Sequence, residues 1–176
     1  MSGITKLIDH ITLPRFVKAH QIFEHNELTE EQIGQRLKAG LENPEIVGKI
    51  KPGMRVCITC GSRGISNMPF VTKSLVEYVK SLGAEPFLIP AMGSHGGATA
   101  EGQIEILKSL GITEELMGCP ILSSMETVKI SHVTDGEDDF DVCIDKNASE
   151  ADAVIALNRV KAHTSFQGPY ESGLMK

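Results

Sequence analysis

Two histidines have the surroundings expected of proton-transfer residues. His95 lies in the glycine-rich sequence Gly-Ser-His-Gly-Gly (93–97), after an apolar run at 86–90, and His163 follows a second apolar run at 151–157. An imidazole with its ordinary pKa of about 6.5 can accept and return a proton near neutral pH. Either histidine alone could be a structural residue, but the two together, each after an apolar run, favour a functional site. We interpret both as candidate catalytic residues.

Two cationic residues could complete such a site. Arg63 lies in the polar loop Cys-Gly-Ser-Arg-Gly (60–64), where its guanidinium could bind a carboxylate or phosphate or equally pair with an acidic neighbour. Lys176 and Lys161 could bind anions, although an ordinary surface position is a strong alternative for Lys161. His132 falls inside an expected strand and is interpreted as a structural or surface residue.

The candidate residues follow predicted strands. The sequence predicts buried strands at 54–59, 86–90 and 151–157. Between them it predicts helices at 69–83 and 99–110. Strands alternating with helices predict an α/β fold, with a mostly parallel central sheet and helices on both faces in a Rossmann-like three-layer arrangement. Parallel strands end at one edge, where such sheets bind ligands. We therefore expect Arg63, His95 and His163 to share one rim.

The remaining segments predict peripheral elements. These are an extended edge strand at 13–23, a helix opened by a capping box at 29–32, a helical turn at 113–116, and strands at 127–133 and 140–144. The last two strands could pair across the acidic turn at 135–141, which adds a short antiparallel region. The length and the lack of repeats predict a single α/β domain over residues 1–176.

The composition argues against several functions. A net charge of −6 and an aromatic content of six Phe, two Tyr and no Trp argue against nucleic-acid binding. No apolar run approaches the roughly 18 residues of a membrane span and no signal peptide is recognisable, so we expect a cytoplasmic protein with reduced thiols. Cys57 and Cys60 form a lone C-x-x-C, and the acidic turn lacks calcium-loop spacing, so we predict no metal site there. P-loop, dinucleotide and esterase motifs do not occur.

Three segments in order resemble the N-terminal domain of the nickel-pincer-dependent lactate racemases and related 2-hydroxyacid racemases and epimerases. Ala-Met-Gly-Ser-His-Gly-Gly-Ala-Thr (91–99) resembles the segment that carries a catalytic histidine. Thr-Cys-Gly-Ser-Arg (59–63) is similar to the segment with the substrate-binding arginine. Residues 158–176 resemble the segment with a second catalytic histidine and a cofactor-anchoring lysine.

The resemblance implies roles for four residues. His95 and His163 would be the acid/base pair, Arg63 would bind the substrate, and Lys176 would tether a nickel-pincer nucleotide. It further implies an isomerase whose small-molecule substrate is a 2-hydroxy acid. One histidine would remove the hydroxyl proton while the C2 hydrogen passes to the cofactor as hydride, and return to the other face of the planar 2-keto acid inverts the centre.

The sequence also departs from the family pattern. Cys60 stands where the family commonly has an acid, and Gly96 and Gly97 replace a basic residue and a proline, so the resemblance does not specify lactate as the substrate. In the family, the nickel-ligating histidine and a second domain follow the lysine. We therefore expect an N-terminal piece of a longer racemase, with its C-terminal domain absent and no activity by itself.

Two alternatives remain open at this stage. His95 and His163 could instead bind zinc or iron in a hydrolase or lyase. A third possibility is a non-catalytic module that binds anions or nucleotides through loop amides and Arg63.

Overall fold

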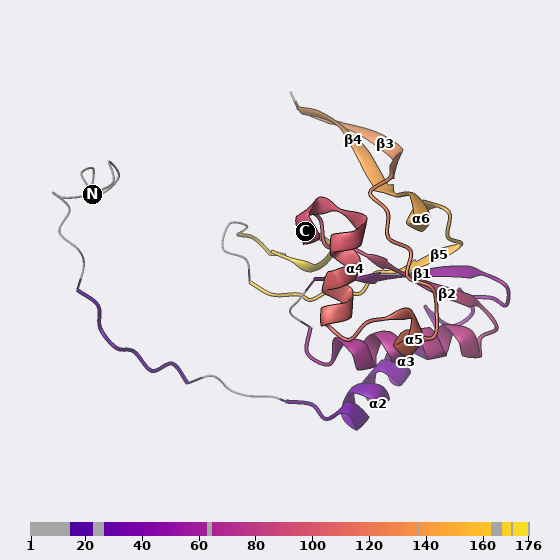
Figure 1. The fold of residues 1–176 in the computed structure, drawn as a ribbon, viewed down its shortest axis with the longest axis horizontal. Helices are drawn as coiled ribbons and strands as arrows, with labels where there is room; N and C mark the ends of the chain where they lie inside the picture. Colours follow the sequence, from indigo (N-terminus) through magenta and orange to yellow (C-terminus); the bar gives the residue numbers. More distant parts are fainter. Residues whose placement is uncertain are drawn as a thin grey trace.

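Three parallel strands form the central sheet of the computed structural model (Figure 1). They are β1 (Arg55–Cys60), β2 (Glu85–Pro90) and β5 (Ala153–Ile155), in the spatial order β2-β1-β5. The structure describes residues 15–22, 27–62, 65–136, 138–162, 167–169 and 171–175. The predicted α/β class with a mostly parallel sheet is confirmed.

Strand β2 contains two prolines, which the sheet accommodates on its outer side. Pro86 and Pro90 alternate with Leu88, whose N–H points away from β1 and donates to the carbonyl of Pro120 at 2.9 Å. The two missing N–H groups therefore lie outside the β1–β2 ladder, where proline is tolerated. The ladder itself pairs every residue of β1 with one of β2, from Arg55 opposite Glu85 onward.

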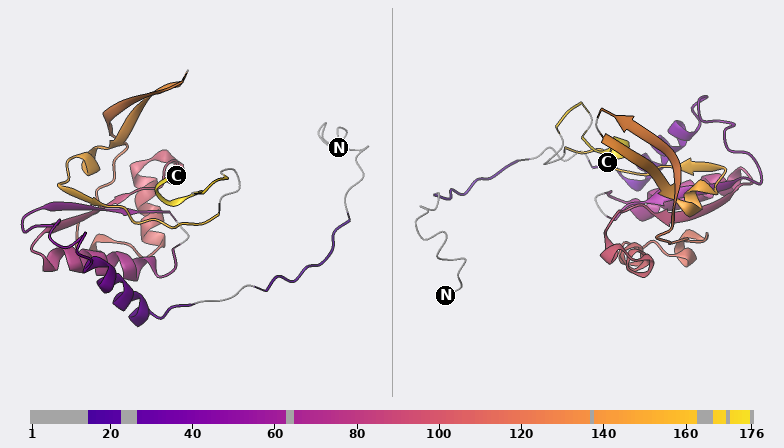
Figure 2. Two further views of the ribbon diagram at one scale, coloured as in Figure 1. Left: turned by 180° about the vertical axis from the view of Figure 1, so that it is seen from behind. Right: turned by 90° about the horizontal axis from the view of Figure 1, so that it is seen from above.

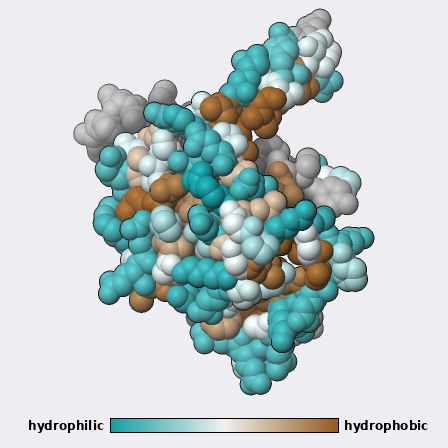
Figure 3. Space-filling view, turned by 90° about the vertical axis from the view of Figure 1, so that its right-hand side faces the viewer, coloured by the Kyte–Doolittle hydropathy of each residue, from teal (hydrophilic) through white to brown (hydrophobic). Residues whose placement is uncertain are grey.

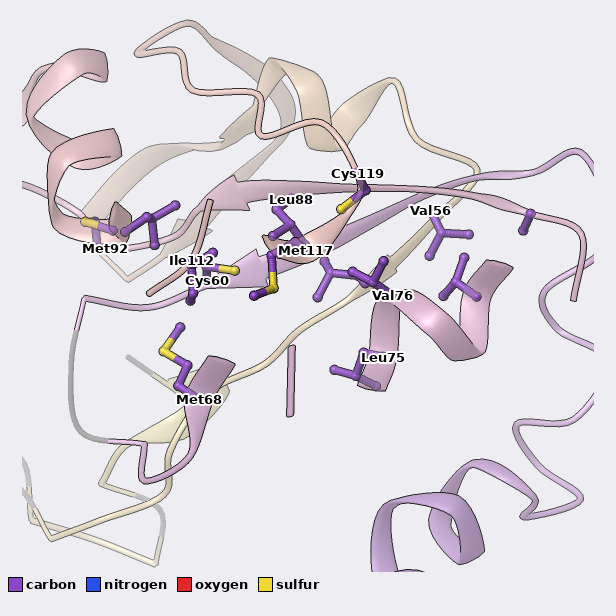
Figure 4. Packing of buried hydrophobic residues seen from close by; sticks show 14 residues of the cluster. Val56, Cys60, Met68, Leu75, Val76, Leu88, Met92, Ile112, Met117 and Cys119 are labelled. Carbon is purple, nitrogen blue, oxygen red and sulfur yellow. The ribbon is translucent and has the colours of Figure 1, made fainter. Parts of the chain in front are cut away.

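One face of the sheet carries the main core. The helices that contribute to it are α3 (Met68–Ser81), α4 (Ala100–Ser109) and α5 (Glu114–Met117). Val56 from β1 and Val76 from α3 are fully buried there (Figure 4). Ile58 from β1 and Leu107 from α4 are fully buried in the same cluster. Alternate side chains of a strand point to opposite faces, so β1 needs a second apolar layer on its other side.

The second face is covered more thinly. Cys57 and Phe87 point to this side and pack with Ala148 of α6 (Lys146–Ser149), a helix of four residues. The predicted arrangement with helices on both faces is therefore confirmed, although the two layers are unequal. Most of the burial lies on the α3 side.

A separate two-stranded hairpin projects from the body (Figures 1 and 2). Strands β3 (Thr127–Asp135) and β4 (Asp138–Asp145) pair antiparallel, with a register shift between Lys129 and Ser131. This confirms the predicted antiparallel region. Hydrophilic side chains line much of this arm, and apolar side chains gather near its base (Figure 3).

The N-terminal part differs from the prediction. Helix α2 (Glu30–Leu41) begins with the expected capping box, in which Thr29 accepts from the Gln32 backbone N–H. The predicted strand at 13–23 is wrong where it can be compared, because residues 15–22 have no regular structure and lead away from the body (Figure 2). Phe16 is 90% exposed. A strand needs a neighbour to pair its backbone groups, and none of the described strands lies beside this segment.

Two short 3₁₀ helices, η1 (Gly96–Ala98) and η2 (Gly173–Met175), lie on segments that follow β2 and β5. No helix among the described residues has the length and apolar character needed to cross a membrane. The single-domain assignment for residues 1–176 stays a prediction.

Candidate functional site

The loops that follow the three strands begin side by side. Because the strands are parallel, β1, β2 and β5 all end at one edge of the sheet. The Ala91 N–H donates to the Cys60 carbonyl at 2.7 Å, which joins the first residues after β2 to the end of β1. The Leu157 N–H donates to Thr59 Oγ1 at 2.9 Å and holds the chain after β5 beside β1. The three loops therefore start from one rim, whereas two of the residues expected there, Arg63 and His163, lie outside the described residues.

A short hydrogen bond links two of these loops. His95 Nδ1 lies 2.5 Å from Ser62 Oγ, and both side chains are half-buried. Ser62 follows β1 and His95 follows β2, so the contact spans neighbouring strand ends. Among the described residues, nothing is hydrogen-bonded to the other ring nitrogen, Nε2. Within the described part of the chain, the ring is thus anchored through Nδ1.

A buried glutamine holds the histidine loop in place. Gln103 of α4 is 4% exposed, and its Nε2 donates to the Gly93 carbonyl at 2.8 Å and to the His95 carbonyl at 3.4 Å. Burying a side-chain amide in this way costs free energy unless its hydrogen bonds are made. The His95 backbone is therefore fixed by α4, while its ring is fixed by Ser62.

The adjacent glycines explain why the loop needs this sequence. Gly96 has φ +66°, and a Cβ there would lie 2.5 Å from the Gly102 carbonyl carbon. Gly97 has φ +68°, but nothing lies within 4 Å of a Cβ at that position. Gly96 is thus required by the close approach of the loop to α4, whereas Gly97 borders open space.

The C-terminal segment folds back onto the chain that leaves β5. Ser172 is buried, and its Oγ lies 2.5 Å from both the backbone N and the backbone O of Lys161. Gly173 has φ +74° and approaches Asn158 so closely that a Cβ would lie 3.1 Å from Oδ1. Residues 171–175 therefore lie against the segment at 158–161, which starts at the carboxyl rim.

Three of the four predicted site residues lie outside the described part of the chain. These are Arg63, His163 and Lys176. Their sequence neighbours are placed: Ser62 precedes Arg63 and contacts His95, and residues 158–162 lead from the rim toward His163. The proposed roles of all four residues stay predictions.

The two cysteines of the C-x-x-C do not form a site. Cys57 belongs to the core on one face of the sheet and Cys60 to the core on the other. Burial raises the pKa of each thiol to about 12, so both are neutral thiols at physiological pH. Cys60, which stands where the family commonly has an acid, therefore supplies no negative charge to the rim. Within the described ranges, no group of three or more His, Cys, Asp or Glu side chains could hold a metal ion.

His132 has different surroundings on the hairpin. Its Nε2 lies 2.5 Å from Asp139 Oδ1 and its Nδ1 lies 2.6 Å from Asp141 Oδ1. Lys129 Nζ lies 2.5 Å from the same Asp141 oxygen. The pKa of Asp141 is lowered most by the hydrogen bond from Lys129, and less by the hydrogen bond from His132. This is an exposed cross-strand charge network, as expected for a structural or surface histidine.

Sequence reasoning did not single out Ser62 and Gln103. Gln103 had a detectable signal, since it shares the buried face of α4 with Leu107 four residues later and is the polar member of that face. Ser62 had only its position next to Arg63, and its contact with His95 depends on how the two loops meet.

The comparisons with known proteins give one match. A family model described as the lactate racemase N-terminal domain matches residues 7–173. Searches of curated proteins and of solved structures gave no significant match. The matched range includes Ser62, His95 and the chain that follows β5. This chain belongs to the lactate racemase N-terminal domain family.

Proposed function

We propose that this chain is the catalytic N-terminal domain of a 2-hydroxyacid racemase or epimerase, an isomerase with a small-molecule substrate. Membership of the family supports the reaction class. The observation that carries the proposal is the position of His95, at the ligand-binding edge of a parallel sheet with one ring nitrogen anchored. We further propose a cytoplasmic location, in keeping with the free cysteines of the chain.

His95 is the candidate general base in this proposal. Its Nδ1 contacts Ser62, so Nε2 is the nitrogen left to take the proton of a substrate hydroxyl. The two enantiomers of the substrate present that hydroxyl in different directions. A second base, His163, would take the proton on the opposite side of the substrate. Arg63 would bind the substrate carboxylate through its guanidinium fork. His163 and Arg63 enter the proposal through the resemblance.

The family depends on a nickel-pincer nucleotide. When bound, this cofactor supplies the acceptor for the hydride that leaves the substrate C2. Lys176 would hold it. Two observations fit this role: residues 171–175 return to the segment leaving β5, and the glycine loop borders open space at Gly97. The residues present are therefore compatible with the group.

The proposal is tested with the complete protein loaded with the cofactor. Each enantiomer of several short 2-hydroxy acids is supplied, and its mirror image is measured by chiral chromatography. We expect interconversion of at least one acid, and His95→Asn should reduce its rate by roughly 10²–10⁴-fold, the usual contribution of general acid–base catalysis.

His132→Asn is the matched control, because it removes an exposed histidine that lies on the hairpin strand β3 and not on a loop that follows the central sheet. We expect it to leave the rate unchanged. Full activity in the His95 variant would contradict the proposed role of His95. Absence of interconversion for every acid, with the cofactor bound, would contradict the function itself.

A further inference from the structure

We infer that Ser62 is the positioning residue of His95: its hydroxyl accepts a hydrogen bond from Nδ1–H and leaves Nε2 unprotonated and facing the substrate. This inference rests on the proposed function for its catalytic meaning. The tautomer that it assigns can be measured without any activity.

The contact itself is specific. At 2.5 Å, His95 Nδ1 and Ser62 Oγ lie closer than the partners of an ordinary N–H···O hydrogen bond, so the contact is direct. A neutral imidazole carries one proton, and the nitrogen without the proton is the base. If Nδ1–H donates to Ser62, Nε2 is free to accept the substrate proton. When Nε2 has been protonated, Nδ1–H still donates to the same oxygen, so the contact persists through the proton transfer.

Both partners are held by other contacts. The Ala91–Cys60 hydrogen bond joins the first residues of the two loops. Gln103 donates to two carbonyl groups within the histidine loop, those of Gly93 and His95. The Ser62–His95 contact therefore joins two segments that are already fixed, and little conformational entropy is lost when it forms.

Among the residues that the structure describes, no charged group takes the place of Ser62 beside the His95 ring. The nearest candidate in the sequence is Cys60, but its side chain is fully buried in the core and its pKa is raised to about 12. Among the described residues, Ser62 is the only side chain hydrogen-bonded to the His95 ring. A hydroxyl can accept from Nδ1–H without adding a negative charge beside a site that must bind an anionic substrate.

A purely structural role predicts a different outcome. If the contact only joined two loops, its loss would loosen them without selecting a tautomer. In water, histidine favours the tautomer with the proton on Nε2. Removal of the Ser62 hydroxyl should therefore move the His95 proton from Nδ1 to Nε2, which blocks the base.

The test uses Ser62→Thr and Ser62→Val, which have the same shape and differ in the hydroxyl. Each variant of this 176-residue chain is labelled with ¹⁵N-histidine, and the protonated ring nitrogen of His95 is identified by NMR above the titration range. Assignment uses His95→Asn. We expect Nδ1–H in the native chain and in Ser62→Thr, and a shift toward Nε2–H in Ser62→Val. The same tautomer in Ser62→Thr and Ser62→Val would overturn the inference.

Activity of the complete, cofactor-loaded protein provides the second readout. We expect Ser62→Val to lower kcat about tenfold with little change in KM, and Ser62→Thr to recover most of it. If the tautomer shifts as expected but no 2-hydroxy acid is interconverted, the inference stands and the proposed function fails. If His95→Asn abolishes activity while Ser62→Val changes neither tautomer nor kcat, the function stands and the inference fails. Should Ser62→Val not fold, Ser62→Ala replaces it in both measurements.

Discussion

The two described histidines with hydrogen-bonded rings show what separates a candidate base from a structural residue. His95 has one ring nitrogen on a neutral hydroxyl, and its loop is held against α4 by the buried Gln103. His132 has both ring nitrogens within 2.6 Å of a carboxylate oxygen. A ring with a carboxylate oxygen against each nitrogen presents neither nitrogen to a substrate. The two histidines are therefore distinguished by the groups that their ring nitrogens contact.

The parts of the fold that carry the two histidines also differ in how well they are packed. The rim loops extend from strands with a packed core on both faces, in which Val56 and Leu88 are fully buried. The hairpin is a two-stranded ribbon whose residues are mostly exposed, and Phe140 is 51% exposed. Catalytic groups need a rigid support, because small displacements reduce the rate strongly. The rim provides that support and the hairpin does not.

The largest effect in this comparison is expected from the glycine loop. Gly96→Ala should lower both the free energy of unfolding and the racemisation rate, because a Cβ would lie 2.5 Å from the backbone of Gly102 and α4 or the loop must shift. Gly97→Ala is the matched control, with a similar φ of +68° and open space around the Cβ. It should cost only the roughly 1–2 kcal/mol of a left-handed backbone. Denaturant titration measures both, and equal losses would contradict the close approach at Gly96.

The smallest effect is expected on the hairpin. The pKa of Asp141 is lowered in the folded chain by Lys129 and His132, so its contribution to stability is present above its unfolded pKa of about 3.9. That contribution is lost as the pH falls through the lower, folded value. Asp141→Asn should therefore slightly lower Tm near neutral pH and weaken the fall in Tm on acidification below about pH 4. Thermal melts from pH 7 to pH 2 measure this, and an unchanged profile would mean that the network contributes nothing.

The sequence predicted the elements whose signals are local. The apolar runs located β1 and β2, and the capping box at Thr29 located the start of α2. The strand predicted at 151–157 is shorter in the structure, at Ala153–Ile155. It ends early because the Leu157 N–H bonds to the Thr59 side chain and not to a backbone carbonyl.

Features that depend on tertiary contacts were not predictable in this way. Residues 15–22 have an extended, apolar pattern, but no described strand pairs with them. His95 was identified from its glycine-rich loop, whereas its partner Ser62 lies 33 residues earlier and has no sequence signal for the contact. A loop composition can indicate a reactive residue, but the residue that orients it is found only when the loops are assembled.

The most direct test of the central claim follows the C2 hydrogen of the substrate. The complete, cofactor-loaded protein is incubated with one enantiomer of a C2-deuterated 2-hydroxy acid, and the opposite enantiomer is isolated and analysed by mass spectrometry. With His95 moving only the hydroxyl proton, the account predicts that the product retains its deuterium. Complete replacement of the deuterium by solvent hydrogen would contradict it.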